Sequence, residues 1–363
     1  MLKPHQFTEL FLNDVPLMDV RAPVEFEKGA FPASINCPLM NDAERQAVGT
    51  CYKEQGQQAA IALGHKLVQG DVKAQRIASW QTFAEQNPNG VLYCFRGGMR
   101  SQIVRQWLRD AGLDMDYIEG GYKALRHFLI EHLQTRINTG NIYVLSGATG
   151  CGKTEVIHKW PHSIDLEGLA NHRGSAFGHT GSAQPAQITF ENAWSVNWMK
   201  RAHQSSAPVL FEDESRLIGR IAVLPEFLAR TKEAPIIHLK ATFEERVQRI
   251  RKDYFVNAYK QQLPNGEEYA LDYLDNFIRL ALNRIQKRLG GKRHKLLLTL
   301  LDDSLALLKS TGRWSRFDSL IEVLLNDYYD PMYNYQYAKK THQQIMEGDH
   351  SEVLQWLAMQ LSN

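Results

Sequence analysis

Short apolar runs alternate with segments of helical periodicity in the first third of the chain. Apolar runs at 15–20 and 91–94 predict two buried strands, and a third strand is expected within 115–122. Residues 101–112 carry apolar side chains at helical spacing and end at a glycine, which predicts a helix. A closing helix is expected over 123–136. Strands that alternate with helices are typical of a parallel α/β domain.

A polar, glycine-containing joint at 137–141 separates this pattern from a second one. Residues 142–147 form an apolar run that leads into a Gly-rich turn and a helix, so the α/β alternation begins again. Two more apolar runs predict strands further along, within 208–215 and 235–241. The sequence therefore predicts two α/β domains, 1–136 and 137–363, which suits a chain of 363 residues.

From residue 243 to about 325 the pattern is mostly helical and contains a basic run, formed by Arg284, Lys287, Arg288, Lys292, Arg293 and Lys295. Such a run either follows a nucleic-acid backbone or forms the solvated face of a helix. The tail beyond it is expected to be irregular around Pro331. It holds five tyrosines beside two lysines, namely Tyr328, Tyr329, Tyr333, Tyr335, Tyr337, Lys339 and Lys340. These rings either stack on unpaired bases or pack against the helical region.

Composition narrows the class of protein. Lys and Arg number 42 against 40 Asp and Glu, so a nucleic-acid site must be a local patch rather than a global field. The four cysteines form no C-x-x-C pair, which argues against a zinc site or a disulfide framework and favours a reducing cytoplasm. No signal peptide and no run of roughly 18 apolar residues is present, so we expect a soluble cytoplasmic protein without a membrane partner.

Cys94 opens a Gly-rich loop, Cys-Phe-Arg-Gly-Gly-Met-Arg-Ser, between a predicted strand and a predicted helix. Loop N–H groups and a helix N-terminus favour a thiolate at such a place. Arg96 and Arg100 add positive charge that helps to keep the sulfur ionised. The spacing from Cys94 to Arg100 also suits a cysteine phosphatase, although those enzymes usually have His where this chain has Tyr93.

Other segments favour covalent group carriage by this cysteine. The N-terminal part resembles the rhodanese domain in three motifs: Asp19-Val-Arg21, Glu25-Phe26 and Gly29-Ala-Phe-Pro-Ala-Ser-Ile-Asn36. The segment Glu119-Gly-Gly-Tyr122 is similar to the end of that domain. The resemblance implies that the first two motifs brace the fold and that Cys94 carries a persulfide-type group.

Residues 147–154, Gly-Ala-Thr-Gly-Cys-Gly-Lys-Thr, match the P-loop pattern in full, between a strand and a helix. Phosphate-binding positions are Gly147, Gly150, Gly152, Lys153 and Thr154. Backbone N–H groups wrap a diphosphate, the lysine reaches its outer oxygens and the threonine hydroxyl can hold Mg²⁺. Cys151 lies inside the loop, and its side chain is expected to point away from the ligand.

Two polar segments supply further candidate residues. At the end of a predicted strand, Glu212 or Asp213 either holds a metal through water or caps the next helix, and Arg216 follows closely. The segment 165–178 is dense in glycines and polar groups, as loops that serve a site often are. Its His172 and Arg173 are candidates for contact with a phosphate or a base. The alternative for each is an ordinary surface side chain.

Six motifs in order make the whole chain resemble the tRNA 2-selenouridine synthases. They are Asn41–Arg45, Val48–Lys53, Cys94–Ser101, the P-loop, Asp165–Gly178 and Glu212–Arg216. The resemblance implies a rhodanese-like parallel-sheet domain followed by a P-loop α/β domain with a largely helical, tRNA-binding extension. It also implies exchange of sulfur for selenium in the wobble 2-thiouridine of tRNA, with Cys94 as the covalent selenium carrier.

The resemblance further implies two substrates besides tRNA, selenophosphate and geranyl diphosphate, the latter for geranylation of the same sulfur. An enzyme that supplies selenophosphate is an expected partner. No tightly bound cofactor is implied, and Mg²⁺ is expected at most at the P-loop. Two alternatives stay open: a rhodanese fused to an ATP-dependent kinase or adenylating domain, and a non-catalytic module that binds RNA or nucleotide.

Overall fold

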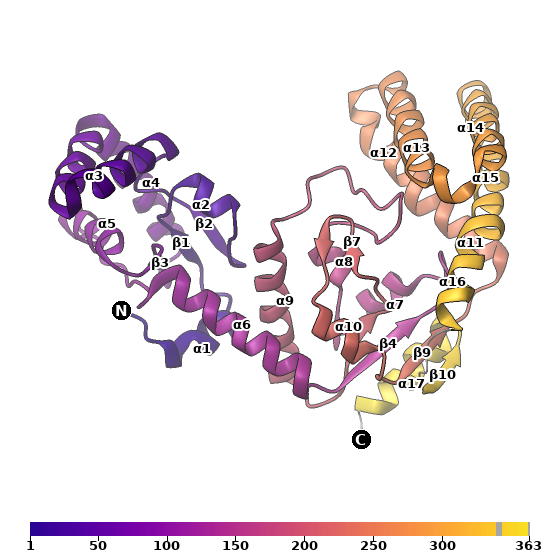
Figure 1. Ribbon diagram of the computed structural model, residues 1–363, viewed down its shortest axis with the longest axis horizontal. Coiled ribbons are helices and arrows are strands. Elements are labelled where there is room, and N and C mark those ends of the chain that lie inside the picture. Colours follow the sequence, from indigo (N-terminus) through magenta and orange to yellow (C-terminus); the bar gives the residue numbers. More distant parts are fainter. Residues whose placement is uncertain (339–342, 362–363) are drawn as a thin grey trace. The chain divides into compact units, whose positions relative to one another are not determined.

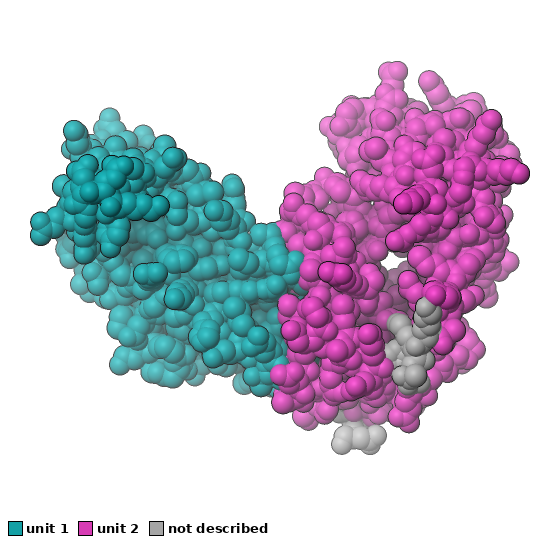
Figure 2. All heavy atoms as spheres, viewed as in Figure 1, with its two compact units in different colours: residues 1–136, 186–203 teal, residues 137–185, 204–363 magenta. Residues whose placement is uncertain are grey.

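A computed structural model describes residues 1–338 and 343–361, and the chain divides into two compact units (Figures 1 and 2). Unit 1 comprises residues 1–136 and 186–203, and unit 2 comprises residues 137–185 and 204–363. Within the described part of the chain, no helix is long and apolar enough to span a membrane.

Unit 1 is built on a three-stranded parallel sheet in the order β2-β1-β3, with β1 Leu17–Asp19, β2 Ser34–Asn36 and β3 Val91–Tyr93. The strands predicted at 15–20 and 91–94 are confirmed. The strand expected within 115–122 is reduced to isolated bridges at Tyr117 and Ile118. Gly120 and Gly121 both have positive φ, so the extended backbone stops there and a helix begins.

The helices of unit 1 are η1 Pro4–Gln6, α1 Phe7–Leu12, α2 Pro23–Glu27, α3 Asp42–Leu67, α4 Gly70–Gln86, α5 Met99–Asp110 and α6 Gly121–Thr139. The helices predicted near α5 and α6 are confirmed. Sequence patterns did not single out α3 and α4, which are largely exposed and have weak apolar periodicity. Asn41 begins α3 with a capping box, and Gly56 interrupts it at φ 85°.

Helix α9, Gln187–Gln204, belongs to unit 1 except for its last residue, so the compact units differ from the predicted division into 1–136 and 137–363. Its Val196 and Met199 pack in one core with Leu125 and Leu129 of α6. The side chain of Asn192 donates to the backbone oxygen of Ala30 at 2.8 Å. The apolar face of this helix is therefore covered by the other elements of unit 1. Because these contacts join residues far apart in the sequence, the pattern of apolar residues in the helix does not predict them.

Unit 2 contains a five-stranded parallel sheet in the order β10-β9-β4-β6-β5. Its strands are β4 Ile142–Ser146, β5 Ser163–Ile164, β6 Val209–Glu212, β9 Ile236–Leu239 and β10 Gln344–Gly348. A separate hairpin pairs β7 Leu217–Ile218 with β8 Ile221–Ala222. The three strands predicted for this half are confirmed, and β4, which precedes the P-loop, lies in the middle of the sheet.

The remaining helices of unit 2 confirm the predicted helical region and add to it. They are α7 Lys153–Lys159, α8 Leu166–Leu169, α10 Pro225–Thr231, α11 Phe243–Ile250, η2 Arg251–Val256, α12 Asn257–Gln262, η3 Leu263–Asn265, α13 Glu267–Leu289, α14 Gly291–Thr311, α15 Arg316–Leu324, η4 Leu325–Tyr329, α16 Asp330–Tyr337 and α17 His350–Leu361. Helices α12 to α15 stand together beside the sheet (Figure 1). Their own core includes Leu274, Ile278, Leu297, Leu301 and Leu320.

The tail expected to be irregular around Pro331 is helical in α16, so that prediction is wrong. Pro331 lies in the first turn of α16, directly after the π-helical segment η4, and such wide turns are a usual place for a proline within a continuous helix. Tyr328, Tyr329, Tyr333, Tyr335 and Tyr337 lie on η4 and α16. Lys339 and Lys340 lie outside the described residues.

Candidate functional site in unit 2 and the cysteine loop of unit 1

The P-loop has the strand–loop–helix context that its sequence predicts, between β4 and α7. Gly150 and Gly152 have φ values of 82° and 92°, the left-handed region that favours glycine. A Cβ atom at Gly147 would lie 2.6 Å from the sulfur of Cys151 and 2.7 Å from the backbone oxygen of Leu239. Local backbone geometry therefore requires each of these glycines.

Side chains from two distant helices hold the carbonyl groups of the loop. Three hydrogen bonds do so: Arg246 Nε donates to Thr149 O at 2.8 Å, Arg249 Nη1 to Gly150 O at 2.7 Å and His350 Nε2 to Gly152 O at 2.9 Å. Within one peptide plane the C=O and N–H point in opposite directions. The N–H groups of Gly150 and Lys153 are thereby turned away from these side chains, as an anion-binding loop requires.

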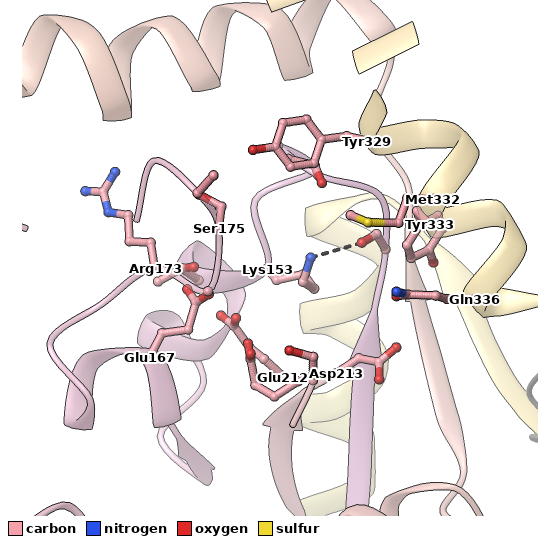
Figure 3. Close-up of a pocket in the computed structure, with 18 of the residues that line it drawn as sticks. Lys153, Glu167, Arg173, Ser175, Glu212, Asp213, Tyr329, Met332, Tyr333 and Gln336 are labelled. Atoms are coloured by element: carbon pink, nitrogen blue, oxygen red, sulfur yellow. Dashed lines mark hydrogen bonds between the residues drawn. The ribbon is translucent and has the colours of Figure 1, made fainter. Parts of the chain in front are cut away.

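Lys153 begins α7 and donates from Nζ to the backbone oxygen of Gly147 at 2.9 Å (Figure 3). Burial lowers the pKa of its ammonium group, but the nearby Cys151 sulfur and carboxylates such as Glu212 outweigh burial and raise the pKa above its usual value. Lys153 is therefore a fixed positive charge that faces the cavity of the loop.

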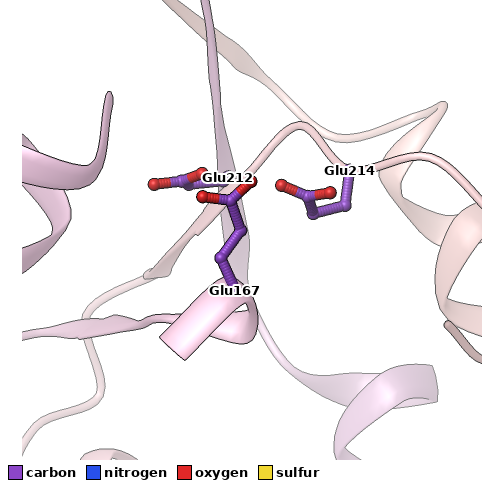
Figure 4. A group of neighbouring side chains, drawn as sticks. All are labelled: Glu167, Glu212 and Glu214. Carbon is purple, nitrogen blue, oxygen red and sulfur yellow. The ribbon is translucent and has the colours of Figure 1, made fainter. Parts of the chain in front are cut away.

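Three carboxylates gather beside the P-loop: Glu167 of α8, Glu212 at the end of β6 and Glu214 just after it (Figure 4). One oxygen of each lies within 4.8 Å of the others. Glu212 is 2% exposed, and its Oε1 has no hydrogen-bond partner among the described residues. Burial raises the pKa of all three carboxyl groups, and the charge of Glu212 raises those of Glu167 and Glu214 further.

Asp213, the other acidic candidate, lines the same cavity but turns to different partners. It accepts a hydrogen bond from Ser146 Oγ at 2.9 Å. Neither Glu212 nor Asp213 caps a helix, because the chain next forms the β7–β8 hairpin. The prediction of a helix cap is therefore wrong. Of the two residues, Glu212 is the better candidate for a metal ligand, because it accepts a hydrogen bond from the side chain of the P-loop residue Thr154.

The P-loop opens into a cavity of about 1200 Å³ in unit 2. Its lining includes the predicted P-loop residues Gly147, Gly150, Gly152, Lys153 and Thr154. It also includes Arg173 and Arg216, together with Arg284, Lys287 and Arg288 from the predicted basic run. In the same run, Arg293 lies outside the lining and forms an ion pair with Asp327 at 2.9 Å.

The structure separates the two candidates of the polar loop. Arg173 lines the cavity (Figure 3). It donates to the backbone oxygen of Asp253 at 2.7 Å, and its guanidinium lies over the ring of Tyr254. His172 is not among the lining residues and instead forms a backbone bridge with His179. Burial, with His179 next in effect, lowers the pKa of His172. Arg173 is therefore the residue of this pair that can meet a ligand.

In unit 1, Cys94 follows β3 directly and is 3% exposed. The N–H groups of residues 95–98 donate to no acceptor among the described residues. Gly97 has φ 62°, and a Cβ there would lie 2.5 Å from the backbone oxygen of Ile118. The loop is therefore closed against the turn that precedes α6.

The two arginines of this loop have different surroundings. Arg100 donates to Glu25 at 2.8 Å. Burial raises the pKa of the Glu25 carboxyl group, but the hydrogen bond and charge of Arg100 contribute to a net pKa below its usual value. Arg96 is exposed. The buried pair of Asp19 and Arg21, at 2.6 Å, lies nearby in the same fold, and Arg21 stacks over the ring of Tyr122. Residues that carry the N-terminal resemblance thus brace the strands and turn around the cysteine loop.

Comparisons with known proteins identify the family of this chain. Residues 140–363 match the model of the tRNA 2-selenouridine synthase AAA domain. The tRNA 2-selenouridine synthase of Marinobacter nauticus is 50% identical over 354 residues, which cover 96% of each chain. The synthase of Photobacterium profundum is 47% identical over 363 residues and covers 99% of this chain and 100% of its own. The chain belongs to the tRNA 2-selenouridine synthase family.

As a member of the tRNA 2-selenouridine synthases the chain is an enzyme, so the alternative of a non-catalytic binding module is wrong. The synthase of Pseudomonas syringae pv. tomato, at 49% identity, covers 97% of this chain.

Sequence analysis did not single out Glu167 and Glu214 as site residues. The only signal was their place within two motifs of the family resemblance, Asp165–Gly178 and Glu212–Arg216.

Proposed function

We propose that the enzyme replaces sulfur by selenium in the wobble 2-thiouridine of tRNA, with selenophosphate as the selenium source. Relatives of nearly equal length bear the name tRNA 2-selenouridine synthase. The observation that carries the proposal is the pairing, in one chain, of the Cys94 loop with a complete P-loop cavity. Mass spectrometry of nucleosides after incubation of thiolated tRNA with protein, geranyl diphosphate and selenophosphate tests it, and tRNA without 2-selenouridine would contradict it.

Unit 1 is, in this proposal, a rhodanese-like domain with Cys94 as the residue of the selenium step. Its support is a parallel sheet whose strand β3 delivers the cysteine to a loop of free N–H groups. Asp19 with Arg21, and Glu25 with Arg100, pair within this fold. A selenophosphate-supplying enzyme is the proposed partner of this unit.

Geranyl diphosphate is the proposed ligand of the P-loop. The thiouridine sulfur attacks C1 of the geranyl group, the S–C1 bond forms, and the C1–O bond breaks as diphosphate leaves. Lys153 and the loop N–H groups stabilise the charge on that leaving group. The selenium of selenophosphate then attacks C2 of the base, the geranyl thiolate departs as the C2–S bond breaks, and water cleaves the Se–P bond to release phosphate. Alkylation makes the sulfur a better leaving group.

Mg²⁺ is the proposed cation of the P-loop site, where Thr154 and Glu212 would hold it with Glu167 and Glu214 close by. The unpartnered Oε1 of buried Glu212 is the observation that favours a cation there. Glu212→Gln should weaken binding of Mn²⁺ in the presence of pyrophosphate about tenfold or more, measured by electron paramagnetic resonance. Asp213→Asn is the matched control and should bind Mn²⁺ normally. An equal loss of Mn²⁺ affinity in both variants would contradict a metal site at Glu212.

Cations on the rim of the cavity are proposed to hold tRNA phosphates. Lys287→Ala with Arg288→Ala should weaken tRNA binding and flatten its salt dependence, because each lost contact releases about one counterion fewer. Lys292→Ala with Lys295→Ala removes the same charge from exposed positions outside the cavity lining and should have a smaller effect. Filter-binding affinities at two salt concentrations compare the pairs. Identical losses would show that only net charge matters.

A further inference from the structure

One face of the helical segment 328–337 is turned into the P-loop cavity (Figure 3). The residues of this face are Tyr328 and Tyr329 of η4 and Met332, Tyr333, Gln336 and Tyr337 of α16. They recur at intervals of three and four, which places them on one side of the helix. The cavity therefore has an aromatic wall in addition to its phosphate-binding loop.

Two rings of this wall are held in fixed positions. Tyr333 and Tyr337 stack with centroids 5.6 Å apart and planes at 24°. The Tyr333 hydroxyl lies 3.2 Å from Ser146 Oγ, at the end of the strand that enters the P-loop. Tyr337 donates from its hydroxyl to Gln344 at 2.9 Å. Burial raises the pKa of Tyr333 to about 12, so its hydroxyl keeps its proton near neutral pH. The pair forms a rigid surface immediately beside the loop.

Arg246 connects this wall to the P-loop. Its guanidinium donates to the backbone oxygen of Thr149 and pairs with Asp330, the first residue of α16. Arg246 is 8% exposed, so its end of this bridge is shielded from solvent. The distance between the phosphate cradle and the aromatic wall is therefore set by a buried ionic contact rather than by a flexible loop.

Gln336 gives the wall a polar group. Its side-chain amide is exposed, points into the cavity and makes no hydrogen bond with any residue in 1–338 or 343–361 (Figure 3). An amide offers one acceptor and two donors, which match the N3–H and C4=O groups on the edge of a uracil ring. A purely hydrocarbon ligand would offer this amide no hydrogen-bond partner.

The rim of the cavity carries the complementary charge for RNA. Arg173, Arg284, Lys287 and Arg288 line the same cavity as the aromatic wall. Positive side chains that hold phosphates, together with rings that accept an unstacked base, are the usual means of binding single-stranded RNA. A base bound on the wall would lie in the same cavity as a diphosphate on the P-loop.

We infer that Tyr333, Gln336 and Tyr337 form the subsite that receives the unstacked thiouracil base of the substrate RNA. The inference rests on the proposed function and specifies where in the cavity the thiouracil base binds. The rings of Tyr333 and Tyr337 provide the stacking surface, and Gln336 reads the pyrimidine edge. The base sulfur is thereby presented to a ligand held by Lys153.

The test compares two anticodon stem-loop RNAs, one with 2-thiouridine and one with an abasic site at the wobble position. Wild-type protein should bind the thiouridine RNA about tenfold more tightly, a size typical of one stacked base. Gln336→Leu and Tyr337→Leu should each lose most of this preference and bind the abasic RNA normally. Tyr335→Leu is the matched control on α16, since Tyr335 is 64% exposed and outside the cavity lining. Fluorescence anisotropy gives all affinities.

Geranyl diphosphate binding to the same variants separates the alternatives. Unchanged affinity for geranyl diphosphate, with loss of base preference, supports the base subsite. Weakened affinity for geranyl diphosphate with base preference intact would overturn it and assign the wall to the isoprenoid chain. Equal loss of affinity for both RNAs would also overturn it. If wild-type protein binds no geranyl diphosphate but prefers the thiouridine RNA through Gln336, the proposed P-loop ligand fails while the base subsite stands.

Discussion

Lys153→Ala is expected to slow geranyl transfer to thiolated tRNA by about 10²- to 10³-fold, in an assay without ATP. Lys153 is held toward the loop by its hydrogen bond to Gly147, and its ammonium group keeps a raised pKa. Its charge can therefore stabilise the diphosphate as it leaves, and loss of one such group typically has an effect of this size. Mass spectrometry of geranylated nucleosides over time provides the rate.

Lys159→Ala is the matched control, since Lys159 lies on the same helix, is exposed and is absent from the cavity lining. It should transfer geranyl groups at the wild-type rate. Full activity of Lys153→Ala would contradict the assignment. An absolute requirement for ATP would instead favour the alternative of an ATP-dependent kinase or adenylating domain. Lys153→Ala protein that still converts pre-geranylated tRNA to selenouridine would assign one half-reaction to each unit.

Cys94→Ser is expected to abolish selenium incorporation into tRNA, to below about 1% of the wild-type level. Cys94 follows β3 and opens the loop whose N–H groups at 95–98 have no acceptor in the described chain. A serine hydroxyl keeps the shape but is far less nucleophilic than a thiolate. Selenium in purified tRNA, measured by elemental mass spectrometry, is the readout.

The other three cysteines provide controls for this result. Cys37 and Cys51 are buried, and burial raises the pKa of the Cys37 thiol. Their Ser variants should keep most selenium incorporation. Cys151 packs in the core beneath the P-loop and is absent from the cavity lining, as the sequence predicted. Its Ser variant should affect geranylation more than conversion of pre-geranylated tRNA. Normal selenium incorporation by Cys94→Ser would disprove a covalent role for this residue.

The sequence alone determined the features that depend on neighbouring residues. The P-loop was identified in full because its glycines adopt backbone angles and close contacts that few other residues allow. The strands β3 and β4 were predicted because continuous apolar runs reflect burial on both faces of a parallel sheet. The loop of Cys94 was predicted between a strand and a helix for the same local reasons.

Only the tertiary structure decided which distant segments meet. Glu167 and Glu214 join Glu212 because the ends of different elements converge beside the P-loop. Lys287 faces the cavity of Lys153, whereas Arg293 from the same basic run pairs with Asp327. Helix α9 packs on unit 1 although its neighbours in sequence belong to unit 2. Such contacts join residues far apart along the chain, so they depend on which faces of the helices and sheets are buried against one another. The periodicity of one segment shows which of its faces is apolar but not which segment covers that face.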